Sequence, residues 1–232
     1  VDLLSREEEV SIAQRIDVSR TAVLDGVLDT QAGINAIIDL PRQVRKGLRS
    51  LRQILDGSSN QEPDQSTGLT GVERIEVIAL EIKRVARARQ RSQKRVNKTA
   101  RRKNRDYNSE LRELTIRMRV NWNVVTEIAE FLKSARDEIR DWRGVLDEYA
   151  TLCGDTVYRI RIEDGELKTP RRPKEVDKLA WDALCGSVEK ALRRIEDIEM
   201  KVGLDYEALR ERVRHLGRHQ RKLERAKSDM IL

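Results

Sequence analysis

The chain has 232 residues, of which 38% are apolar and another 38% are charged, with only 12 glycines and 4 prolines. This composition is typical of long amphipathic helices and argues against a sheet protein. The formal net charge is +7, and no apolar run approaches the length of a membrane span. We therefore expect a cytosolic protein with no membrane partner and no secretory signal peptide.

The first helices can be read from their boundary residues. Ser5 is followed three positions later by Glu8, which is the pattern of a capping box and predicts that a helix begins there. A short apolar helix is predicted at about Thr30 to Leu40, and Pro41 is expected to end it and restart the chain. The polar stretch 56–71, rich in Gly, Ser and Pro, is predicted to be a linker.

After this linker the pattern becomes that of long helices. A predicted helix from Val72 runs into a basic stretch, residues 83–105, that contains no Asp or Glu. Between residues 111 and 149 the apolar residues follow a strict 3–4 spacing, which predicts a continuous coiled-coil-like seam. Asn121 is the one polar interruption of that seam, and we interpret it as a residue that fixes the register of packing.

The remaining elements complete the fold prediction. Alternating apolar residues predict a small hairpin or loop near 155–170, and a second helical seam follows at 181–202. Gly203 is expected to end that helix, and Asp205 is expected to cap the last one. Long helices with short connections predict an all-α protein, an antiparallel helical bundle with long coiled-coil-like helices.

The sequence offers little for catalysis. It has no glycine-rich phosphate loop, no nucleophile elbow and no dinucleotide fingerprint. The two histidines, His215 and His219, are spaced for a metal but lack a third ligand nearby, so we interpret them as solvated residues. Cys153 and Cys185 are expected to be reduced, packed thiols, with a disulfide or metal role left open. We expect no enzyme, and no catalytic residue, metal site, cofactor or small-molecule substrate.

Two basic helical segments are candidate binding surfaces, although solvated helix faces would have the same composition. The acid-free stretch suits a DNA backbone because phosphate attraction needs only clustered cations. Its candidate DNA-binding residues are Arg84, Arg87, Arg91, Lys94, Arg95, Lys98, Arg101 and Arg102. The last helix suits an acidic protein surface as well as DNA, since acidic residues there offset part of its charge. Its candidate residues are Arg214, Arg218, Arg221, Lys222 and Arg225.

Both ends of the chain resemble a known family. The segment from Leu3 to Ile16, LLSREEEVSIAQRI, resembles conserved region 1.2 of the sigma-70 family of bacterial transcription initiation factors. Near the other end, Gly203-Leu204 precedes a basic helix that contains Arg225-Ala226-Lys227, and this order resembles the approach to region 2 of that family. The residues between the two ends match the family only in their charged, helical character.

The resemblance implies a fragment of a primary-type sigma factor whose partners are core RNA polymerase and promoter DNA. In that reading residues 1–56 form a region 1.2-like helical segment, 57–71 a linker, 72–202 the non-conserved helical insertion, and 203–232 a basic helix leading into region 2. The insertion would brace region 1.2 and face the polymerase clamp or the upstream duplex. Two alternatives stay open, a stand-alone polymerase-binding regulator and a structural coiled-coil protein.

Overall fold

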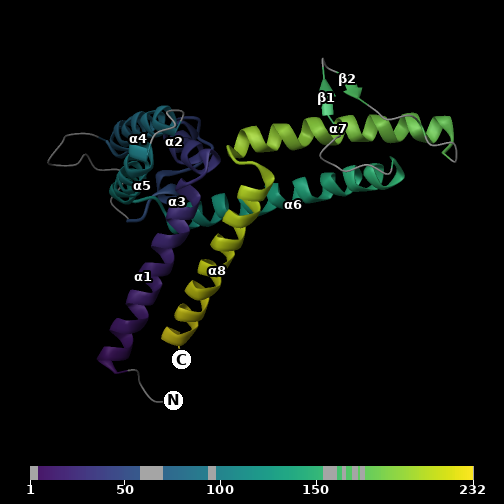
Figure 1. The fold of residues 1–232 in the computed structure, drawn as a ribbon. Coiled ribbons are helices and arrows are strands. Elements are labelled where there is room, and N and C mark those ends of the chain that lie inside the picture. The colour runs from purple at the N-terminus through teal and green to yellow at the C-terminus, as the bar shows by residue number, and fades with distance from the viewer. Residues whose placement is uncertain are drawn as a thin grey trace. The chain divides into compact units, whose positions relative to one another are not determined.

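The computed structural model describes residues 5–57, 70–93, 98–153, 161–163, 166–168, 172 and 176–231. Within them the chain forms eight helices and one two-stranded hairpin (Figure 1), so the prediction of an all-α helical fold is confirmed. The helices are α1 (Arg6–Leu28), α2 (Gln31–Arg45), α3 (Leu51–Ile54), α4 (Gly71–Gln93), α5 (Lys98–Met118), α6 (Trp122–Cys153), α7 (Lys178–Val202) and α8 (Tyr206–Ile231).

Helix ends that depend on local chemistry lie where the sequence predicts them. At the start of α1 the Glu8 N–H donates to Ser5 Oγ over 3.3 Å, and the Ser5 N–H donates to the Glu8 carboxylate over 2.9 Å. Gly203 ends α7 in the left-handed region, with φ 78°. Asp205 caps α8 by accepting the Ala208 N–H over 2.8 Å. Each of these devices satisfies backbone groups that a helix end leaves unpaired.

The prediction that Pro41 ends a helix is wrong. Helix α2 runs through Pro41 and ends at Arg45. A proline inside a helix removes one backbone hydrogen bond. Helix α2 nevertheless continues past Pro41, which lies in a packed environment. Pro41 is buried, as are Ile37 and Leu40 on the same helix. Burial of this apolar face offsets the lost backbone bond.

The prediction of one continuous seam over 111–149 is also wrong. Helix α5 ends at Met118, and α6 begins at Trp122. Arg119 lies between them with a φ of 58°, a left-handed conformation that is unusual for a residue other than glycine. Asn121 accepts the Asn123 N–H at its side-chain oxygen over 2.8 Å, so it starts α6 instead of fixing a register inside a longer helix.

The break between α5 and α6 is held by backbone pairing with a distant segment. The Asp56 N–H donates to the Arg119 carbonyl over 2.8 Å, and the Asn121 N–H donates to the Ile54 carbonyl over 2.8 Å. These bonds flank an isolated antiparallel bridge between Leu55 and Val120. Ile54 and Leu55 are buried, so the Ile54 carbonyl lies where a backbone group needs a partner, whereas Asp56 and Arg119 are exposed.

The chain divides into two compact units, and the first joins Val1–Phe131 with Glu211–Leu232. In it α2 and α4 are antiparallel, because Gln31 contacts Gln90 and Arg45 contacts Glu76. Helices α4 and α5 are also antiparallel. Glu81 on α4 pairs with Arg117 near the end of α5, whereas Arg89, later on α4, contacts the same residue, Asp29, as Asn108, earlier on α5. The unit therefore combines sequence segments that we predicted as separate regions.

Helices α1 and α8 pack antiparallel within this first unit. The Arg15 guanidinium lies 3.0 Å from the Asp229 carboxylate, and Gly26 faces Leu216. A Cβ added to Gly26 would lie only 2.6 Å from a Leu216 methyl carbon, so the helices approach closely at this point. The two ends of the sequence are thus in direct contact.

The second unit is Leu132–Arg210. Its part of α6 runs antiparallel to α7, with Arg194 2.6 Å from Glu138 and the Tyr149 and Trp181 rings stacked at 5.3 Å between centroids. A small hairpin or loop was predicted near 155–170, and strands β1 (Arg161–Glu163) and β2 (Glu166–Lys168) pair antiparallel there.

Two glycines in the first unit should respond oppositely to replacement by alanine. A Cβ at Gly33 would lie 2.2 Å from the backbone oxygen of Val27, which cannot move easily, so Gly33→Ala should lower the free energy of unfolding by about 1–3 kcal/mol. Gly217, in α8, has open space around it, and Gly217→Ala should raise stability by about 0.5–1 kcal/mol. Urea titration of both variants measures the two effects, and equal stability of Gly33→Ala and wild type would contradict the described contact.

Candidate nucleic-acid interface

Three of the candidate DNA-binding residues lie together on α4. Arg84, Arg87 and Arg91 are exposed, on the face opposite the buried Ile78 and Ile82. In the described ranges none of the three forms an ion pair with a carboxylate.

The other five candidates of this stretch cannot be assigned to a surface. Lys94 and Arg95 lie outside the described residues. Lys98, Arg101 and Arg102 belong to α5, but their side chains lie outside what the structure describes. The three α4 arginines therefore share one face of their helix. Whether the basic surface continues along α5, as predicted, stays a prediction.

The five candidates on α8 form a single stripe. All are exposed, and their spacing of three and four residues puts them on the side opposite the buried Leu216 and Leu223. From Arg214 to Arg225 the stripe is roughly 16 Å long at 1.5 Å per residue. The stripe consists of Arg214, Arg218, Arg221, Lys222 and Arg225.

Two acidic residues of α8 pair with cations outside this stripe. Glu224 pairs with Lys227 at 2.9 Å, and Asp229 pairs with Arg15 at 3.0 Å. No member of the stripe is in an ion pair within the part of the chain that the structure describes. A row of cations on one side of a helix suits a row of DNA phosphates. Each phosphate that such a cation neutralises releases condensed counterions, and this release favours binding.

Not every arginine of the basic segments faces outward. Arg89 lies on the inner side of α4 with only 12% of its side chain exposed. Its guanidinium donates to the Leu28 carbonyl over 2.8 Å and to the Asp29 carbonyl over 3.0 Å. These are carbonyls at the end of α1, where the helix dipole favours a positive charge. Burial is the main cause that lowers the pKa of Arg89, and the neighbouring Asp29 acts in the opposite direction.

Asp29 joins three further helices to the end of α1. Its carboxylate accepts the Asn108 side-chain N–H over 3.0 Å and lies 2.6 Å from the Arg212 guanidinium and 3.8 Å from that of Arg89. Nearby, Arg112 donates to Asp25 over 2.8 Å. Sequence reasoning did not find this cluster, because its members are spread over α1, α4, α5 and α8 and no spacing rule connects them.

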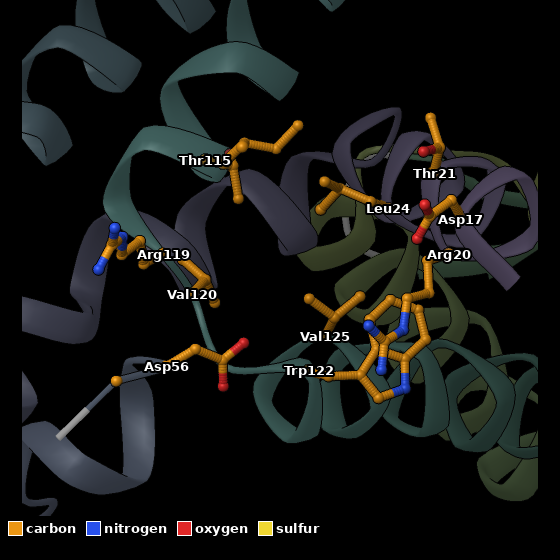
Figure 2. A pocket seen from close by; sticks show the side chains of 12 residues that line it. Asp17, Arg20, Thr21, Leu24, Asp56, Thr115, Arg119, Val120, Trp122 and Val125 are labelled. Carbon is orange, nitrogen blue, oxygen red and sulfur yellow. The ribbon is translucent and has the colours of Figure 1, made fainter. Parts of the chain in front are cut away.

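A cavity of about 610 Å³ lies beside α1 in the first unit (Figure 2). Arg20 lies over the Trp122 ring, 5.5 Å from its centroid, in a cation–π contact. Asp17, Asp56 and Arg119 also line the cavity. The charges of these two carboxylates and two guanidinium groups cancel, so the cavity has no net positive charge that would attract phosphate. We therefore do not include it in the candidate interface.

The histidines of α8 form a close pair. The His215 and His219 rings lie 4.4 Å apart between centroids. Burial, followed by His215 and the cations Lys222 and Arg218, lowers the pKa of His219. Among the described residues no group of three or more His, Cys, Asp or Glu side chains could hold a metal ion. The cationic surroundings also disfavour a bound cation at this pair.

Comparison with protein-family models and with curated proteins finds no match to this chain. Within the described segments no helix is both long and apolar enough to cross a membrane.

Replacing Arg89 should destabilise the protein far more than replacing its neighbour Arg87. Arg89→Met removes the donor to two carbonyls and leaves Asp29 with fewer partners, so the free energy of unfolding should fall by about 2–3 kcal/mol. Arg87→Met changes an exposed residue on the same helix and should stay within about 0.5 kcal/mol of wild type. Chemical denaturation of both variants provides the comparison, and similar values for the two would show that the buried arginine is not structural.

Proposed function

We propose that this chain is a segment of a primary-type sigma factor that binds core RNA polymerase and promoter DNA and directs transcription initiation. The observation that carries the proposal is the direct packing of α1 against α8. The region 1.2-like segment has a capping box at the start of α1, while Arg225-Ala226-Lys227, from the residues that resemble the approach to region 2, lie in α8. These α1 and α8 parts of the resemblance are therefore neighbours in one compact unit.

The contacts of the intervening helices support a bracing role. Helices α4 and α5 belong to the segment that we interpret as the non-conserved insertion, residues 72–202. Arg89 on α4 and Asn108 on α5 both hold Asp29 at the end of α1. An insertion that supplies these contacts would fix the orientation of the region 1.2-like helix relative to the helix leading into region 2.

The unpaired cations support a contact with DNA phosphates. Phosphate contacts position a protein on a duplex and carry no sequence information themselves. The α8 stripe is suited to that role because its cations have no acidic partners among the described residues. In this proposal base recognition is left to other parts of the sigma factor, and the protein acts in the cytoplasm, where RNA polymerase works.

The direct test is reconstitution with bacterial core RNA polymerase. Full-length protein containing this chain should bind core enzyme and support promoter-dependent transcription in vitro, because a sigma factor supplies both functions. Core enzyme without the added protein is the control for background transcription. Failure to bind core enzyme under conditions where a known sigma factor binds would reject the proposal.

The α8 stripe should contribute to promoter affinity in a salt-dependent manner. Each lost phosphate contact lowers the slope of log affinity against log salt by about 0.9. The variant Arg214→Gln/Arg218→Gln/Arg221→Gln/Arg225→Gln should therefore reduce the slope for promoter binding by the reconstituted holoenzyme by up to about 4 units. The control is Arg210→Gln/Lys227→Gln on the same helix, whose side chains are paired with Glu207 and Glu224. An unchanged slope in the fourfold variant would remove the stripe from the DNA interface.

A further inference from the structure

Helix α4 presents a face that nothing in the described chain covers. Its inner side is buried, with Ile75, Ile78 and Ile82 almost inaccessible to solvent. Its flanks are occupied by ion pairs to neighbouring helices, from Glu76 to Arg45 on α2 and from Glu81 to Arg117 on α5. Four residues before Val77, on the same side, the exposed Glu73 carboxylate accepts from Thr70 at the start of the helix. The outward stripe that follows consists of Val77, Leu80, Arg84, Arg87 and Arg91.

The spacing of this outward stripe is that of a helix-packing surface. Its members are separated by three, four, three and four residues, the repeat with which one helix packs along another. The first two members are large apolar side chains, and Val77 and Leu80 are 44% and 65% exposed. The next three are exposed arginines without acidic partners in the described ranges. The stripe is therefore apolar at one end and cationic at the other.

This composition distinguishes the α4 face from the α8 stripe. The α8 stripe contains cations only, which is sufficient for phosphates. A phosphate backbone gains nothing from the exposed Val77 and Leu80, whereas a protein surface buries apolar area at the centre of a contact and places charges around it. The apolar end of the α4 face thus favours a protein partner over a nucleic acid.

We propose that the outward face of α4 docks an acidic amphipathic helix of a partner protein. Apolar side chains of that helix would cover Val77 and Leu80, and its carboxylates would pair with Arg84, Arg87 and Arg91. A second copy of the same face is a poor fit. A parallel copy would place cations opposite cations, and an antiparallel copy would place Val77 and Leu80 opposite arginines. This inference rests on the proposed function. In that function the acidic helix would belong to core RNA polymerase, and promoter DNA would contact α8.

The experiment uses the 232-residue chain and a fluorescent synthetic helical peptide with leucines at 3–4 spacing flanked by glutamates. One variant, Val77→Ser/Leu80→Ser, removes the apolar end, and another, Arg84→Gln/Arg87→Gln/Arg91→Gln, removes the charges. All five positions are exposed, so both variants should fold, and circular dichroism checks that they do. The peptide should bind wild type, and each variant should weaken the affinity at least about tenfold. A peptide with lysines in place of the glutamates should not bind.

The α8 fourfold glutamine variant is the matched control, because it removes similar charge from another helix of the same unit. If it weakens peptide binding as much as the α4 variants do, or if Val77→Ser/Leu80→Ser binds like wild type, the attraction is charge alone and the inference is overturned. Absence of peptide binding to wild type overturns it as well. A larger loss of duplex DNA affinity than of peptide affinity in the arginine variant would assign the face to DNA instead.

A parallel measurement with core RNA polymerase separates this inference from the proposed function. Full-length protein that binds core enzyme equally well with and without the α4 substitutions would leave the sigma assignment intact and overturn the docking of polymerase on α4. If no version binds core enzyme, the sigma assignment fails, and the peptide measurement still decides whether the α4 face recognises an acidic helix.

Discussion

The first compact unit depends on the carboxylate at the end of α1. Asp29 is held by Asn108 and Arg212, and Arg89 covers both its carboxylate and the terminal carbonyls of the helix. Charges that are withdrawn from water must be paired and hydrogen bonded. Helices α4, α5 and α8 can satisfy this requirement only when all three reach the same point. The ionic cluster thus sets the relative register of four helices, while burial of their aliphatic faces supplies most of the stabilisation.

This cluster also divides the arginines of the protein into two classes. On α4, Arg89 is turned inward while Arg84, Arg87 and Arg91 face solvent. On α8, Arg212 pairs with Asp29 while Arg214 and Arg218 face solvent. A count of basic residues cannot separate structural cations from those available to a partner. Among the described residues, burial and pairing do separate them, and the candidate cations whose side chains are described form one stripe on α4 and one on α8.

The sequence predicted those features that depend on nearby residues. The caps at Ser5, Gly203 and Asp205 involve groups within a few positions of each other, so spacing alone was sufficient. The five candidate cations of α8 share a face because helical periodicity places them there, and their role in binding stays a prediction.

The failures have a common cause in contacts between distant segments. Pro41 was predicted to break a helix that tertiary burial maintains. The turn at Arg119 depends on backbone pairing with Ile54 and Asp56, and the role of Arg89 depends on Asp29, 60 residues away. No local pattern contains that information. The cavity beside Trp122 could not be predicted for the same reason, since its lining comes from several separate segments.

The pairing of α1 with α8 has a consequence for biosynthesis. Helix α1 leaves the ribosome well before Leu216 and Asp229, the residues that contact Gly26 and Arg15, have been made. Domains generally fold as units during synthesis, and contacts between residues far apart in sequence form late. The nascent chain therefore carries an incompletely covered α1 surface until α8 has emerged from the ribosome.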